Sequence, residues 1–241
     1  MESTIDPAAE IESEDYMGNV IWAALSGAHA SLAQSNENGL RYKPEFAPFG
    51  AAQDYSESSV AQIARMLHAD ERLTLFTQHK PTIPARYEIV REATVIQMIG
   101  AREFAASSDK AIVELGKEDV PSMMRLVEKT DPGPFKERTP EMGRFIGVRE
   151  RGQLVAMSGE RMVAGKYVEV SAVCTHPDWR GQGLAGKLME HLAAGIQHRG
   201  GVPFLHVFST NTSAIRLYKQ LGYRRARELH LTGIVVRAGM G

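Results

Sequence analysis

Apolar positions in the first hundred residues predict two helices and a few short strands. Spacings of three and four residues indicate one helix that begins at Asn19 and a second over residues 56–67. Residues 73–77 form a short strand-like run, and residues 87–90 and 95–98 are weaker strand candidates. We therefore expect a small α/β region in this part of the chain.

The pattern becomes more regular after residue 110. Apolar runs separated by short turns predict an antiparallel meander. Leu184, Leu188, Leu192 and Ile196 are spaced by four and predict a long helix, while Gly222 is suited to end a shorter one. The predicted order is strand 111–115, helix 119–129, short helix 139–143, strands 145–149, 154–163 and 166–175, helix 183–197, strand 203–208, helix 212–221, and strands 224–229 and 233–237.

These patterns predict a mixed α/β fold in three parts. Residues 1–17 are acidic and small, and we expect them to lack a fixed structure. Residues 18–107 are expected to form an N-terminal accessory domain, and residues 108–241 the catalytic domain. The boundary falls in the polar stretch 105–110.

Composition narrows the class of protein and its partners. The chain has 241 residues, 24% of them charged, and a formal net charge of −1, so no electrostatic attraction to nucleic acid or membrane is predicted. Cys174 is the single cysteine, which excludes an intramolecular disulfide and fits a reducing cytoplasm. The sequence shows no signal-peptide pattern and no apolar run of membrane length. We expect a cytoplasmic protein with no metal.

A glycine-rich junction is the most informative segment. The apolar run that ends at Thr175 is followed by Arg180-Gly181-Gln182-Gly183, and a helix then begins. The start of a helix presents free backbone N–H groups and the positive end of the helix dipole. The junction is therefore a candidate site for a phosphate or diphosphate.

Two nucleotide motifs fit this junction incompletely. Gly181, Gly183 and Gly186 have dinucleotide-binding spacing, but that motif expects an acidic residue about 20 positions later, and residues 203–208 contain none. Gly181 with Gly186 and Lys187 has P-loop spacing, but Leu188 stands where that motif needs Ser or Thr. Both readings predict tight NAD or ATP binding, which the missing residues argue against.

Two motifs together resemble the GCN5-related N-acetyltransferases (GNAT), and the FR47-like subgroup in particular. The first is Arg180-x-x-Gly183-x-Ala185, between a strand and the long helix. The second is the segment Asn211–Tyr223, which resembles the family's Asn-x-x-Ala-x-x-x-Tyr…Leu-Gly-Tyr pattern. The resemblance covers roughly residues 111–237 and implies the acyl-CoA N-acyltransferase fold.

The resemblance also implies roles for particular residues. Main-chain groups of Val173, Cys174 and Thr175 would bond the pantetheine arm of acetyl-CoA where two strands splay apart, and Asn211 would fix its end. Tyr218 would protonate the CoA thiolate, since a phenol stays protonated at neutral pH. The diphosphate would lie on the turn and helix start, namely Arg180, Gly181, Gln182, Gly183, Leu184, Ala185 and Gly186.

A proton acceptor for the amine is harder to assign. Glu169 is a candidate base because strand alternation places it on one face with Ser171 and Val173. A salt bridge to an arginine would explain this carboxylate equally well. Glu160 is a weaker alternative, and Cys174 is interpreted as a small buried hydrophobe.

The sequence therefore predicts an acetyl-CoA-dependent N-acetyltransferase that acts by direct attack of a primary amine in a ternary complex. A CoA-binding sensor of the same fold without turnover is the alternative. Acceptor pockets in this family are built by the first helices and the loop near Asp131–Arg138, and here we expect the N-terminal region to contribute. These segments carry no motif that identifies the acceptor, a small amine or a peptide amine, and homodimers are common among such relatives.

Overall fold

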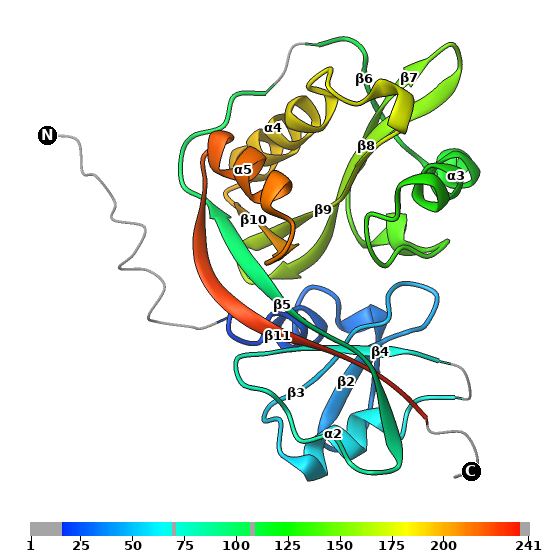
Figure 1. Cartoon of the computed structure of the whole chain (residues 1–241), viewed down its shortest axis with the longest axis vertical. Coiled ribbons are helices and arrows are strands. Elements are labelled where there is room, and N and C mark those ends of the chain that lie inside the picture. Colours follow the sequence, from blue (N-terminus) through cyan, green and yellow to red (C-terminus); the bar gives the residue numbers. More distant parts are fainter. Residues whose placement is uncertain (1–15, 69–70, 107–108, 237–241) are drawn as a thin grey trace, which may run out of the picture.

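The computed structural model describes residues 16–68, 71–106 and 109–236 (Figure 1). Most of the expected unstructured segment, residues 1–15, lies outside the described residues. Met17, at its end, is buried, with 3% of its surface exposed, and its carbonyl accepts a hydrogen bond from Gln97 Nε2 at 3.0 Å. The N-terminal elements are thus anchored to the core from this residue onward.

One eight-stranded sheet runs through the molecule in the order β4-β11-β5-β10-β9-β8-β7-β6. Neighbouring strands are antiparallel except β9 and β10, which are parallel. The strands are β4 (Leu73–Thr77), β5 (Tyr87–Gly100), β6 (Ile112–Glu114), β7 (Phe145–Glu150), β8 (Gln153–Ala164), β9 (Tyr167–Thr175), β10 (Val202–Phe208) and β11 (Tyr223–Val236).

Two long strands replace four predicted short ones. Residues 87–90 and 95–98 belong to the single strand β5, and the prediction of separate strands at 224–229 and 233–237 is wrong, because β11 is continuous. The polar stretch inside each strand hid this continuity from a hydrophobic pattern. The two strands pair along their whole length, with irregularities at Arg225/Arg227 and Gly233/Ile234.

Helices cover both faces of the sheet. Helices α4 (Leu184–His198) and α5 (Thr212–Gln220) pack on the face that includes Val155, whereas α3 (Val120–Thr130) packs on the face of Leu154. Adjacent residues of β8 point to opposite sides, so the two helical layers enclose the sheet (Figure 1). The helices predicted at 119–129, 183–197 and 212–221 are confirmed to within one residue at each end.

The N-terminal region adds two helices and a small antiparallel sheet. These are α1 (Val20–Ser26), α2 (Glu57–Ala64), β1 (Ala33–Ser35), β2 (Gly39–Tyr42) and β3 (Gly50–Ala52). The helix expected from Asn19 begins at Val20, and the Asn19 side chain donates to Ala52 O at 2.6 Å and makes no bond to the helix start. Short 3-10 turns occupy Ala30–Leu32, Lys117–Asp119, Thr139–Met142 and Pro177–Trp179.

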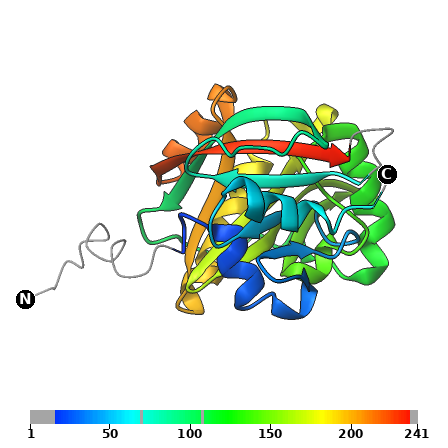
Figure 2. The ribbon, with the colours of Figure 1, turned by 90° about the horizontal axis from the view of Figure 1, so that it is seen from below.

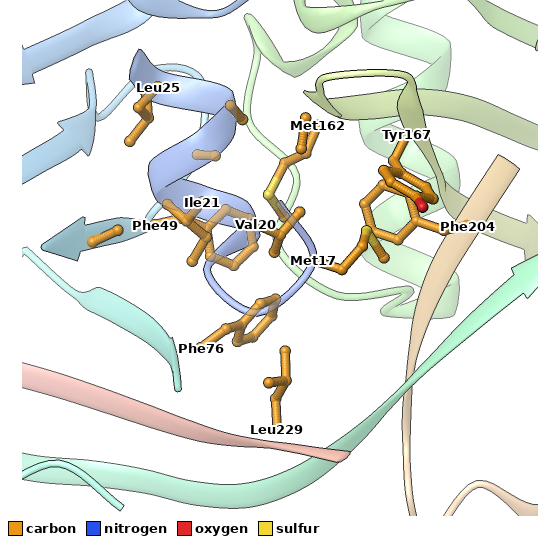
Figure 3. Close-up of a cluster of buried hydrophobic side chains, with 14 of the residues drawn as sticks. Met17, Val20, Ile21, Leu25, Phe49, Phe76, Met162, Tyr167, Phe204 and Leu229 are labelled. Atoms are coloured by element: carbon orange, nitrogen blue, oxygen red, sulfur yellow. The ribbon is translucent and has the colours of Figure 1, made fainter. Parts of the chain in front are cut away.

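The hydrophobic core is shared between the two halves of the chain. Figure 3 shows Phe49 and Phe76 close to α1, in one cluster with Met162 and Phe204 of the large sheet. Figure 2 shows the N-terminal elements below β11. Strands β4 and β5, which precede residue 107, belong to the same sheet as the later strands. Whether residues 18–107 and 108–241 fold as separate domains stays a prediction.

Candidate active site

Strands β9 and β10 separate in the middle of the sheet. They pair in parallel only over Tyr167–Glu169 and Val202–Phe204, although β9 continues to Thr175 and β10 to Phe208. Beyond this point, β10 keeps its pairing with β5 and β9 keeps its pairing with β8. A V-shaped opening therefore forms, with an edge of β9 that has no strand partner among the described residues.

A bulge at Ala172 redirects the end of β9. Ala172 has φ 52°, and the register shifts between the pairs Gly159/Ser171 and Met157/Cys174. Such an extra residue breaks the alternation of faces. Val173 accordingly packs with the α4 cluster, as Val170 does, while Ala172 and Cys174 pack with the α3 cluster. The expectation that Val173 shares a face with Glu169 is therefore wrong.

A first cavity of about 740 Å³ lies in the opening and extends over the start of α4. All of the predicted cofactor-binding residues except Gln182 line it. Its lining consists of Thr130, Val173, Cys174, Thr175, Trp179, Arg180, Gly181, Gly183, Leu184, Ala185, Gly186, Asn211, Ser213, Ala214, Leu217 and Tyr218.

The glycines of the junction shape the floor of this cavity. Gly181 has φ 77° and Gly183 φ 75°, a backbone region that other residues rarely adopt. A Cβ at either position would meet no atom within 4 Å, so the space above them is open. Gly183 precedes α4 without a side-chain cap, so the helix start presents unbonded N–H groups to this space. Backbone donors, the helix dipole and the exposed Arg180 fit a diphosphate.

Helix α5 contributes the two residues of the second motif. Asn211 caps the helix, because its Oδ1 accepts from Ala214 N at 3.1 Å and from Ser213 Oγ at 3.0 Å. Tyr218 lies two turns later, and burial raises the pKa of its hydroxyl to about 12. The tyrosine therefore stays protonated at any physiological pH. Burial likewise raises the pKa of the Cys174 thiol to about 11, in agreement with its interpretation as a buried hydrophobe.

A second cavity of about 340 Å³ adjoins the first. Residues that line both are Thr130, Val173, Asn211 and Tyr218. The second cavity extends away from the glycine-rich junction toward the N-terminal region. Its remaining lining consists of Phe49, Thr74, Phe76, Arg91, Val95, Asp131, Pro132, Gly133, Pro134, Arg161, Val170, Ser171, Ala172, Leu205, His206, Val207, Phe208 and Leu231.

Glu169 lies beside this second cavity but lines neither one. Its Oε2 and Oε1 accept hydrogen bonds from Arg161 at 2.8 and 2.7 Å, and Oε1 also accepts from His206 Nδ1 at 2.7 Å. Burial opposes the charge, but the Arg161 guanidinium and His206 outweigh it and lower the pKa of Glu169 to about 2. The salt bridge to an arginine, expected as one explanation of this carboxylate, is present. The role of Glu169 as a base stays a prediction.

Glu160 also forms an ion pair away from the cavities. It is 6% exposed, and its Oε1 accepts from Arg199 Nη2 at 2.6 Å. Neither cavity includes Glu160 in its lining. The structure therefore gives this weaker candidate a structural partner and no access to the opening between β9 and β10.

The loop near 131–138 and the N-terminal region, which were expected to shape the acceptor side, both contribute to the second cavity, but the sequence did not predict the individual residues. The walls of this cavity come from segments without a motif, including the turn 131–134 and residues of β4 and β5. Arg161 was the available signal, since it is a charged residue inside the apolar run 154–163. Within residues 16–68, 71–106 and 109–236, no three His, Cys, Asp or Glu side chains are placed to share a metal ion. No helix of these residues is long and apolar enough to span a membrane.

Comparisons with known proteins agree with this geometry. The family model described as FR47-like protein matches residues 145–231. The chain is 26% identical over 121 residues to the [ribosomal protein bS18]-alanine N-acetyltransferase of Escherichia coli, covering 48% of this chain and 81% of the relative. It is 30% identical over 99 residues to the N-alpha-acetyltransferase RimI of Mycobacterium tuberculosis, covering 39% of this chain and 61% of that protein.

Solved structures resemble nearly the whole chain. A GCN5-related N-acetyltransferase from Kribbella flavida shares the fold, with a TM-score of 0.62 at 15% identity over 92% of this chain and 96% of the other. A putative acetyltransferase of the GNAT family from Novosphingobium aromaticivorans has a TM-score of 0.86 and 37% identity, covering 92% of this chain and 99% of that one. The chain therefore belongs to the GNAT family and is an N-acetyltransferase.

Proposed function

We propose that the protein transfers an acetyl group from acetyl-CoA to a primary amine by direct attack in a ternary complex. The observation that carries this proposal is the junction of the two cavities at Val173, Asn211 and Tyr218. The first cavity has the donors that a diphosphate needs, and the second offers a separate approach to the same point. Both substrates can therefore be bound at once, with their reacting ends at the junction.

The proposed cofactor contacts follow from the lining of the first cavity. Backbone N–H groups from Gly183 to Gly186 and the Arg180 guanidinium bind the diphosphate. The unpaired edge of β9 at Val173 to Thr175 bonds the pantetheine arm as an added strand would. Acetyl-CoA supplies the acetyl group as a thioester, and an N–H of this edge polarises the thioester carbonyl.

Proton balance assigns a role to Tyr218. Transfer forms a C–N bond and breaks the C–S bond, so the amine loses a proton and the thiolate gains one. Tyr218 lines both cavities and carries its proton at neutral pH, since its pKa is about 12. It is the proposed acid. Glu169 is retained as a proposed base, although its two oxygens are bonded to Arg161 and His206.

A substitution of Tyr218 separates the enzyme from a non-catalytic CoA sensor. We expect Tyr218→Phe to lower kcat roughly 10²-fold or more, because general acid catalysis contributes on this order, while the Kd for CoA stays unchanged. The measurement is steady-state CoA release together with CoA titration.

Tyr223→Phe is the matched control. Tyr223 lies beside Tyr218, with ring centroids 6.4 Å apart, but it lines neither cavity. Its buried hydroxyl has no hydrogen-bond partner within the described residues, so its removal costs little. Equal turnover in both variants and the wild type would contradict the role of Tyr218. Wild-type protein that binds CoA and never turns over would favour the sensor.

A further inference from the structure

The second cavity has the size and walls of a small-molecule site. Its volume of about 340 Å³ lies at the lower end of the range for small ligands. Aromatic side chains from distant segments form its apolar part, with Phe49 and Phe76 at 5.4 Å between ring centroids. Both come from the N-terminal region (Figure 3), outside the residues 145–231 that the FR47-like family model matches. This wall is therefore additional to the part of the chain matched by that family.

Two charged side chains in the lining have no ion pair within the described residues. Arg91 is exposed, and its guanidinium lies over the Phe208 ring, 4.5 Å from the centroid. Asp131 is exposed and lies directly after α3. Arg161, by contrast, is neutralised by Glu169. The cavity thus offers one uncompensated cation and one uncompensated carboxylate.

Three local features disfavour an aspartate with this backbone conformation at position 131. Its backbone is left-handed, with φ 43° and ψ 61°, which costs energy for a residue other than glycine, although less for Asp than for most. It precedes Pro132, which favours extended backbone instead. Its carboxylate also lies at the C-terminal end of α3, where the helix dipole is negative. Residues that break such preferences cluster at functional sites.

Both charges lie near the junction of the two cavities. Asp131 follows Thr130, which lines both cavities. Phe208, under Arg91, accepts a hydrogen bond through its carbonyl from Asn211 N at 2.9 Å, and Asn211 also lines both cavities. Phe49 and Phe76 form an apolar part of the same lining. A ligand that fits this lining has an acidic group for Arg91, an amine for Asp131 and an apolar body.

We propose that the acceptor is a free amino acid with an apolar side chain. Its carboxylate binds Arg91, its ammonium binds Asp131, and its side chain lies against Phe49 and Phe76. This proposal rests on the acetyl transfer proposed above and names the acceptor class for the same site. The ammonium must lose a proton to the proposed base Glu169, directly or through water, before its nitrogen attacks the thioester. Asp131 holds the nitrogen in place and does not take its proton, because an ion pair with a carboxylate favours the ammonium form.

Matched acceptor pairs test the need for the carboxylate. L-phenylalanine is compared with 2-phenylethylamine and L-leucine with isoamylamine, since each pair differs in the carboxylate alone, and an alanine-initiated hexapeptide represents a protein N-terminus. The readout is kcat/KM from CoA release, with acetylated product identified by mass. We expect each amino acid to react at least about tenfold faster than its decarboxylated partner and faster than the peptide.

Two variants with controls assign the charges. Arg91→Gln should bring the amino acid down to the rate of its decarboxylated partner and leave that partner's rate unchanged, whereas Arg86→Gln should change neither. Arg86 is the control because it is also exposed and lies over a ring, that of Tyr87, without lining the cavity. Asp131→Asn should slow both members of a pair, and Glu128→Gln, an exposed carboxylate near the same helix end, should not.

The outcomes separate this inference from the proposed function. Equal rates within pairs, a faster peptide, or no turnover with any of these acceptors would overturn the amino-acid assignment, and retained CoA binding would leave the proposed function standing. An unchanged rate ratio in Arg91→Gln would also overturn it. Loss of CoA binding in the wild type would contradict the proposed function itself.

Discussion

Glu169 is fully buried and charged because Arg161 and His206 together bind both of its oxygens. An isolated carboxylate in this position would be costly, and removing one member of a buried ion pair leaves the other without compensation. The contacts therefore predict that Glu169 stabilises the floor of the second cavity. A direct role as a base would require it to release one of these bonds.

Glu169→Gln tests these two roles. We expect a loss on the order of 3 kcal/mol in the free energy of unfolding at pH 7, because Arg161 would lose its buried carboxylate. Glu228→Gln, in an exposed pair with Arg225, should change it by less than about 0.5 kcal/mol. The measurement is urea denaturation combined with kcat. A variant of wild-type stability without turnover would favour the base.

The same carboxylate predicts a pH dependence of stability. Its pKa falls from 4.5 to about 2 on folding, so the contribution is complete above pH 4.5 and is lost as the pH falls toward 2. Thermal unfolding between pH 7 and pH 3 should show Tm falling below about pH 4.5, and less steeply in Glu169→Gln. Parallel curves for the two proteins would contradict this origin of acid sensitivity.

At the residue scale, the sequence predicts what local chemistry determines. The proposed roles of Gly183 and Tyr218 come from motifs of short spacing, and both residues line the first cavity. The partner of Glu169 could not be chosen from the sequence among many arginines. Arg91 and Asp131 carry no motif, because the cavity that both line is built from segments that are distant along the chain.

The start of α4 shows how one element forms the proposed diphosphate site. Gly183 has a left-handed backbone above open space, whereas Gly186 is inside the helix, and a Cβ there would meet Leu221 at an ordinary 3.6 Å. The two glycines therefore differ in what alanine would do. One position depends on the freedom of glycine, and the other tolerates a methyl group.

Alanine substitution at these two positions should have opposite effects. Gly183→Ala should cost about 1–2 kcal/mol in stability and weaken CoA binding, because it strains the turn. Gly186→Ala should gain about 0.5–1 kcal/mol, as alanine favours a helix. Thermal unfolding and CoA titration check both. A Gly183→Ala protein with unchanged Tm and CoA affinity would contradict the importance of this turn.

At the element scale, local periodicity predicts helices well and long-range pairing poorly. Helices α3, α4 and α5 have continuous apolar faces and were predicted nearly to the residue. Strands β5 and β11 contain polar stretches, and hydrogen bonding between them makes each continuous. The bulge at Ala172 arises from the register of β9 with β8, which a single strand's sequence does not contain.

Strands from both halves of the chain pair in the one large sheet of the molecule. Strand β11 near the C-terminal end has β4 and β5 as its neighbours, and both precede residue 105. β5 also pairs with β10 at the edge of the opening that forms the site. The N-terminal region thus completes the sheet and supplies part of the second cavity.

A chain shortened to residues 105–241 should therefore fail to fold cooperatively. It would leave β11 without strand partners and expose the apolar residues that pack under α1. Circular dichroism during heating is the measurement, with the full chain as control. A cooperative transition in the shortened chain would instead support two independently folding domains with a boundary near residue 107.

Every proposal above depends on acetyl-CoA binding in the first cavity, and a thermal-shift titration measures that binding. A ligand at roughly 100 times its Kd stabilises by about 2.7 kcal/mol, or roughly 5–10 °C in a chain of this size. We predict an upward shift with CoA and acetyl-CoA that NAD and ATP do not produce, and a smaller one in Gly183→Ala. A folded protein that shows no shift with CoA, or an equal shift with ATP, would contradict the assignment of the first cavity to acetyl-CoA.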